Sequence, residues 1–181
     1  MKTRILLLFV LASLSFQLLS GSTYTKVVHK YAKTLTLKDS DYKSYDLTFK
    51  AIEINDSIKA CLIYIDKGQY EKTINYLPAG LEIPLSEIKV LIQDLEEFGK
   101  IYTTPIPSNY TQYSWEFTKS KDRANYTLFI SSEGFWKFCF DIHNDTGNID
   151  NIIRSYNFYH NFHTMNQILA ALKEAVASFD K

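Results

Sequence analysis

Residues that break regular structure are scarce in this 181-residue chain, which has six glycines and four prolines. So few glycines leave little room for a phosphate-binding loop, and the catalytic motifs Gly-x-Ser-x-Gly and His-Glu-x-x-His are missing. Excess charge is also missing, because 20 basic residues balance 20 acidic ones. A nucleic-acid binder needs a basic face, so we expect no nucleic-acid partner, and we expect no cofactor. An enzyme is not excluded, but the sequence leans against one.

What the chain does have is aromatic residues, with 13 tyrosines and 12 phenylalanines. Aromatic side chains favour strands, and a chain with so many of them and so few breakers is not expected to be disordered. Its length suits one domain that buries a substantial core without staples.

The amino terminus has the pattern of a cleavable secretory signal. Lys2 and Arg4 precede an apolar run over Ile5–Leu14, and small residues follow at 20–22. We therefore expect residues 1–22 to be removed and residues 23–181 to form a single secreted or periplasmic domain. The alternative is a retained anchor, but a spanning helix needs about 20 apolar residues and Ser13 already interrupts this run. No membrane span is expected after cleavage.

Alternating apolar residues predict strands in the first half of the chain. Residues 45–54 and 58–65 form a predicted hairpin, with a weak strand before it over 24–37 and a short one after it over 72–76. Apolar residues at helical spacing then predict a helix over 85–98, which Pro84 starts and Gly99 ends.

The second half repeats strands and then a helix. Residues 113–118, 125–131 and 135–142 form a predicted meander, and 156–162 a possible edge strand. A capping box over Thr164–Gln167 predicts the start of the last helix. The predicted fold class is α+β, with a single antiparallel sheet of about five to seven strands packed against two amphipathic helices.

Aromatic residues of the second half are the candidate ligand-binding residues. If the sheet and helices enclose a concave space, these side chains would line it: Trp115, Trp136, Phe140, Tyr156, Tyr159, His160 and His163. The alternative is that the same residues only pack, with the two histidines reaching solvent.

The densest set of possible metal ligands lies over residues 141–150. Its candidates for a cation such as Ca²⁺ are Asp141, His143, Asp145 and Asp150. The EF-hand spacing fails, because counting back from Gly147 places Ile142 at the first ligand position. A polar turn at a strand end is the alternative, since Asn, Asp and Gly are turn formers.

Two further features depend on export. Cys61 and Cys139 could form a disulfide if their strands are neighbours, or remain two separate buried thiols. Four Asn-x-Ser/Thr sequons could carry glycans in a eukaryotic host, and they begin at Asn55, Asn109, Asn125 and Asn144.

The leading functional hypothesis is a non-enzymatic exported domain that binds a protein partner or a small apolar ligand. A concave aromatic-lined face would favour the small ligand, and a filled interior with an exposed apolar patch would favour the protein. One alternative is a small extracytoplasmic hydrolase with His143 or His160 beside a carboxylate. Another is a structural subunit of a surface assembly.

Overall fold

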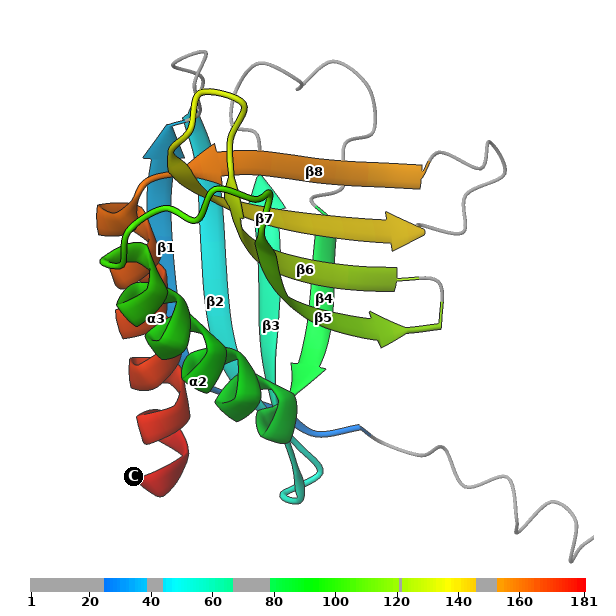
Figure 1. Ribbon diagram of the computed structural model, residues 1–181. Helices are drawn as coiled ribbons and strands as arrows, with labels where there is room; N and C mark the ends of the chain where they lie inside the picture. The colour runs from blue at the N-terminus through cyan, green and yellow to red at the C-terminus, as the bar shows by residue number, and fades with distance from the viewer. Residues whose placement is uncertain (1–24, 39–43, 67–78, 121, 146–152) are drawn as a thin grey trace, which may run out of the picture.

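The computed structural model describes residues 25–38, 44–66, 79–120, 122–145 and 153–181 (Figure 1). The predicted signal peptide, the predicted strand over 72–76 and Asp150 lie outside these residues. Eight strands and two α-helices are described, in the order four strands, helix, four strands, helix. The α+β class is thus confirmed.

Sheet A contains β1 (Val27–Lys38), β2 (Ser44–Ile54), β3 (Ile58–Asp66) and β4 (Ala79–Pro84), paired antiparallel in chain order. The predicted hairpin over 45–65 is confirmed, and its turn places Asn55 and Asp56 at positive φ. Alternation along the strands gives one apolar face, which we call the inner face. It contains Leu47, Phe49 and Ala51 of β2, Cys61, Ile63 and Ile65 of β3, and Leu81 and Ile83 of β4, all buried.

Sheet B contains β5 (Gln112–Lys119), β6 (Asp122–Ile130), β7 (Trp136–Asp145) and β8 (Ile153–His160), again antiparallel in chain order. The predicted meander and edge strand are confirmed, although β7 continues through Asp145, where a turn was expected. Large aromatic residues dominate its inner face. They include Trp115 of β5, Tyr126 of β6, and Trp136, Phe138 and Phe140 of β7.

The prediction of a single sheet of five to seven strands is wrong, because the eight described strands form two separate four-stranded sheets. The strands of sheet B run across those of sheet A and do not continue them (Figure 1). A single sheet would require an edge strand of sheet A, β1 or β4, to pair with an edge strand of sheet B, β5 or β8. Instead β4 is contacted by β6, β7 and β8, which is face-to-face packing of crossed sheets.

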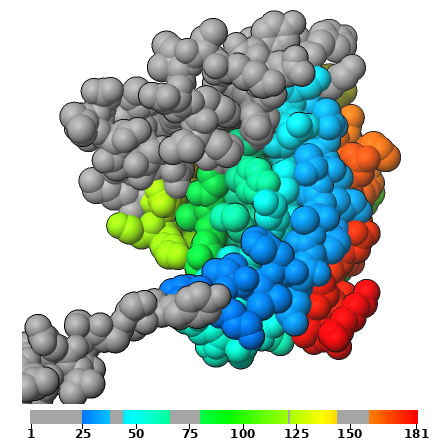
Figure 2. Space-filling model, turned by 180° about the vertical axis from the view of Figure 1, so that it is seen from behind, coloured from blue at the N-terminus to red at the C-terminus, as the bar shows by residue number. Residues whose placement is uncertain are grey.

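Helix α2 (Leu85–Tyr102) packs on β3, β4 and β5, and α3 (Phe162–Ala177) packs on β1, β2 and β7. Sheet B and both helices therefore share the inner face of sheet A. Figure 2 shows the opposite face, where the strands of sheet A lie at the surface and α3 is seen only at one margin.

Both predicted helices are present, but two of their predicted ends are wrong. Helix α2 continues past Gly99 to Tyr102, and Gly99 faces Met165 and Phe162 of α3. Helix α3 begins one turn early, because the Asn161 side chain accepts a hydrogen bond of 2.9 Å from the backbone N–H of Thr164. Asn and Thr are both good caps, so the sequence alone does not choose between them.

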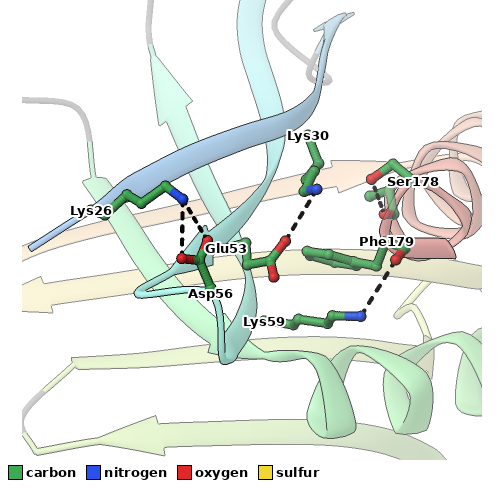
Figure 3. Close-up of polar contacts among 8 residues, drawn as sticks. Lys26, Lys30, Glu53, Asp56, Lys59, Ser178 and Phe179 are labelled. Atoms are coloured by element: carbon green, nitrogen blue, oxygen red, sulfur yellow. Dashed lines mark hydrogen bonds and ion pairs between the residues drawn. The ribbon is translucent and has the colours of Figure 1, made fainter. Parts of the chain in front are cut away.

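Polar contacts fix α3 and the C-terminal turn on sheet A. Glu174 accepts hydrogen bonds from Tyr31 Oη at 2.7 Å and Lys33 Nζ at 3.0 Å, and these donors lower the pKa of its carboxyl. Beyond α3, the ammonium of Lys59 lies 5.6 Å from the centre of the Phe179 ring and 3.4 Å from its carbonyl oxygen (Figure 3). The C-terminus is thereby held against β3.

Candidate functional site: the aromatic end of sheet B

The aromatic residues predicted to line a ligand site are mostly part of the hydrophobic core. Trp115, Trp136, Phe140 and His160 are 3%, 8%, 1% and 9% exposed. They belong to one apolar cluster or lie against it, between sheet B, the helices and sheet A. Residues packed so closely cannot contact a ligand without rearrangement, so these four residues pack, although His160 does not reach solvent as the packing alternative expected.

Phe138 is the centre of this packing. Its ring stacks on Tyr102 of α2 at 5.4 Å and on His160 of β8 at 5.7 Å, measured between ring centroids. It also contacts Phe162 of α3 at 6.4 Å and Tyr126 of β6 at 6.5 Å. One side chain thus joins sheet B to both helices, and such aromatic pairs each contribute about 0.5–1.5 kcal/mol beyond area burial.

His160 is a buried neutral partner of Tyr126. The Tyr126 hydroxyl lies 2.8 Å from His160 Nε2, and burial raises the pKa of the tyrosine well above its usual value, so the hydroxyl stays protonated and donates. His160 Nδ1 then donates toward the carbonyl oxygen of Asn161 at 3.3 Å. Burial lowers the pKa of His160 to about 4, against the opposing effect of that carbonyl. Neither contact supplies the carboxylate that the hydrolase hypothesis requires.

The other candidate ligand residues do not join this cluster. Tyr159 pairs with Cys139 on the opposite face of sheet B and is 45% exposed. His163 is exposed in the first turn of α3. Tyr156 pairs with Ile142 through its backbone, and its side chain lies outside the described residues. The seven predicted residues therefore do not form one site.

Three of the four candidate metal ligands belong to a strand, β7. Asp141 and His143 alternate along β7, so they project from one face with extended backbone between them, and Asp145 is the last residue of the same strand. Asp145's side chain and all of Asp150 are outside the described residues. Among the residues that the structure does describe, no three His, Cys, Asp or Glu side chains gather as a metal site.

Cys61 and Cys139 are both buried on strands of different sheets, and no disulfide joins them. Burial raises the pKa of each thiol to about 12. Each is therefore an unreactive thiol at neutral pH, because the thiolate is the nucleophile. This matches the alternative of two separate buried thiols.

Exposed aromatic residues gather at one end of sheet B, where β5 and β7 begin and β6 and β8 end. This end lies on the side of the helices in Figure 1. We call it the aromatic end and define it by five residues. They are Tyr110, Tyr113, Phe129, Phe135 and Tyr159. Four of them are large exposed hydrophobic residues, at 71%, 37%, 63% and 45% for Tyr110, Tyr113, Phe135 and Tyr159.

Direct contacts join two of these residues to each other and one of them to the core. Phe129 packs edge-on against Tyr159, with centroids 5.9 Å apart. Tyr110 donates a hydrogen bond of 2.9 Å to Gln112, the register partner of Phe129. Tyr113 packs at 6.2 Å from Trp136. Phe129 and Tyr159 thus share the outer face of sheet B, whereas Tyr113, which lies opposite Leu128 in the register, is on the inner face at the same end.

Charge at the aromatic end is largely neutralised. Lys137, the partner of Phe129 across the strands, forms an ion pair of 3.1 Å with Glu133. Ser131 and Phe135 close the turn between β6 and β7 with a backbone hydrogen bond of 2.8 Å, and Gly134 supplies the positive φ of that turn. Phe135 is thus presented on a tight hairpin turn next to a balanced charge pair.

Sequence reasoning missed Tyr110, Tyr113, Phe129 and Phe135, and one signal for them was available. Along β6 the buried face is Ala124, Tyr126 and Leu128, so Phe129 stands out of phase as an apolar residue on the opposite face. Phe135 likewise precedes the buried alternation that starts at Trp136. An apolar residue on the polar face of a strand can belong to a surface site, or a second layer of structure can cover it. Only the fold distinguishes these two possibilities.

No protein-family model matches this chain, and no similar curated protein was found. Within the described residues, no helix is both long enough and apolar enough to cross a membrane. Only the geometry and the chemistry of the described residues therefore point to the candidate site.

Proposed function

We propose that this chain is an exported, non-enzymatic domain that binds another protein through the aromatic end of sheet B. The observation that carries the proposal is the contrast between a filled aromatic interior and the exposed rings of Tyr110, Phe135 and Tyr159 on one end of the same sheet. Soluble monomers seldom expose neighbouring large apolar side chains without a use for them.

A protein partner is favoured over a small apolar ligand by how the rings are exposed. A small-molecule site encloses most of its ligand's surface. Here four of the seven residues predicted to enclose a ligand are buried, and the accessible rings come from loops and strand ends with 37% to 71% exposure. Protein interfaces are enriched in aromatic residues and depleted of unpaired charge at their centres, and the aromatic end has this composition.

The binding test compares two pairs of substitutions of similar exposure. Phe135→Ser with Tyr159→Ser alters the aromatic end. Val27→Ser with Ile58→Ser alters sheet A at residues that are 45% and 54% exposed. Photo-crosslinking in the extracytoplasmic fraction identifies the partner, and titration measures its affinity.

We expect the first pair to weaken binding at least about 30-fold and the second pair to leave it within about threefold, as interface centres dominate affinity. Equal affinity of both variants, or a stronger effect of the sheet A pair, contradicts the proposal. Sedimentation of the purified chain identifies the case in which the partner is a second copy.

Export is tested separately by the mass of the natural protein. Cleavage near residue 22 predicts an extracytoplasmic protein whose first residue lies close to Thr23. Recovery of the protein in the cytosol with Met1 or Lys2 at its start would refute export without bearing on the aromatic end.

A further inference from the structure

The tripeptide Asn-Tyr-Thr occurs twice in the chain, at residues 109–111 and 125–127. Both copies satisfy the acceptor rule for N-glycosylation, so local sequence cannot distinguish them. The fold places them in opposite environments. We propose that Asn109 is an N-glycosylation site of the exported protein and that Asn125 is not, in a host whose secretory pathway transfers oligosaccharides to such sequons. This inference rests on the proposed export. Tyr110, the middle residue of the first copy, belongs to the aromatic end, so a glycan on Asn109 would border the proposed binding surface.

Asn109 lies in the exposed segment between α2 and β5. Its side chain is exposed, and Tyr110 beside it is 71% exposed. The hydroxyl of Thr111 donates to the carbonyl oxygen of Asn109 at 3.2 Å, so the two sequon residues lie on the same turn of chain. A glycan on Asn109 Nδ2 would extend into solvent and leave the backbone pairing of β5, which begins at Gln112, unchanged.

Asn125 lies inside β6, which pairs with β5 on one side and β7 on the other. Its Nδ2 donates to Glu116 at 3.3 Å, and its Oδ1 accepts from the Thr127 hydroxyl. The next residue, Tyr126, is fully buried and bonded to His160. Asn125 alternates with the buried Tyr126, so its side chain projects from the outer face of sheet B, opposite Glu116 and Asp141 in the register. A glycan on this nitrogen would displace the Glu116 contact and crowd the side chains of the two flanking strands, so a chain modified there would assemble sheet B poorly.

The transfer itself is ordinary for a sequon. The Nδ2 nitrogen of Asn109 forms a bond to C1 of the sugar, and the bond from C1 to the donor's lipid-linked diphosphate breaks. The nitrogen loses one proton, and the lipid diphosphate leaves. The host's transferase and lipid-linked oligosaccharide supply the catalyst and the donor, and neither oxidation nor reduction occurs. The protein contributes only an accessible carboxamide whose modified form still folds.

The test isolates the two identical tripeptides. Ser57→Ala and Thr146→Ala remove the other two sequons without changing their asparagines. The full chain is expressed in a eukaryotic secretion host in two forms, one with residues 1–22 and one with a heterologous cleavable signal in their place. Peptide mass spectrometry then measures glycan occupancy at each asparagine in the secreted, folded protein.

We expect occupancy at Asn109 to exceed that at Asn125 at least about tenfold. Thr111→Ala should abolish the glycan, whereas Thr127→Ala should leave it in place. Comparable occupancy at both asparagines, or an unmodified Asn109 in secreted protein, overturns the inference. Secretion with the heterologous signal but not with residues 1–22 would refute export by the natural leader and leave the inference on Asn109 to be decided by the same measurement.

Discussion

Sheet A with α2 and sheet B with α3 follow the same path, four antiparallel strands in chain order and then one helix. Their inner faces differ. Sheet A fills its face mainly with aliphatic side chains such as Ile63 and Ile83, and sheet B fills its face with rings such as Phe138 and Phe140. The comparison indicates that the topology tolerates both kinds of filling, provided that each strand keeps its alternation.

The two kinds of filling have different consequences. Aliphatic side chains pack without polar atoms, whereas rings bring hydroxyl, imidazole and indole groups into the interior. Sheet B accordingly contains the buried Tyr126–His160 pair. In the described part of the chain, the indole N–H groups of Trp115 and Trp136 are buried without a hydrogen-bond partner. We therefore expect the stability of the protein to be more sensitive to pH and to substitutions in the interior of sheet B than to those in the interior of sheet A.

The largest expected effect is acid destabilisation through His160. Its pKa is about 4 in the folded protein and about 6.5 in the unfolded chain. The unfolded state therefore binds more protons between these values, and stability present above pH 6.5 is lost as the pH falls toward 4. The loss should reach roughly 3 kcal/mol, since one pKa unit corresponds to about 1.4 kcal/mol.

Urea unfolding across this pH range measures the loss, and His160→Gln is the control. The substitution should flatten the slope between pH 6.5 and 4, although it also lowers stability at neutral pH. Glu96 and Glu174, whose carboxyl pKa values are lowered by partners, lose their contribution only as the pH falls through about 4.5 and below, so they overlap just the acidic end of this range. An unchanged slope in His160→Gln would assign the effect to other groups.

A smaller effect on the free energy of unfolding is expected when one buried phenylalanine in each half is replaced. Phe49 of sheet A and Phe138 of sheet B are both fully buried. Phe49 faces Ile63 in the register, and Phe138 contacts four rings. Leucine keeps most of the volume but loses ring stacking, so Phe138→Leu should cost about 2 kcal/mol more than Phe49→Leu. Equal free energies of unfolding would mean that the rings contribute only apolar area.

The smallest effect concerns two glycines in matched substitutions to alanine. A Cβ on Gly99 would lie 3.7 Å from the nearest atoms of Met165 and Phe162, an ordinary contact in a helix interior. Gly99→Ala should therefore raise stability by about 0.5–1 kcal/mol. A Cβ on Gly80 would lie 3.0 Å from Tyr64 Cβ, so Gly80→Ala should lower stability.

Thermal unfolding of both glycine variants measures these changes. A loss of stability in Gly99→Ala would show that α2 and α3 already touch at this position more closely than the distances indicate. A gain in Gly80→Ala would show that β3 and β4 can separate at no cost.

Much of the local structure was predictable from short-range patterns. Period-two alternation located β2, β5 and β7, short apolar runs bounded by turn residues located β3 and β6, and helical spacing located α2 and α3, because burial of a face imposes these patterns. Errors fell at ends such as Gly99 and Asn161, where several residues can serve equally well as caps. Candidate site residues were predicted less well, since buried and exposed rings look alike in sequence.

The sequence by itself determined which side chains share a face of each strand and helix, because the backbone geometry of an element fixes that choice locally. Only the tertiary structure decided that eight strands divide into two crossed sheets and that Trp136 is buried while Phe135, its neighbour, is 63% exposed. The tertiary structure also places the two identical Asn-Tyr-Thr tripeptides in different environments. Periodicity assigns a side chain to a face, but the residues that cover that face come from distant parts of the chain.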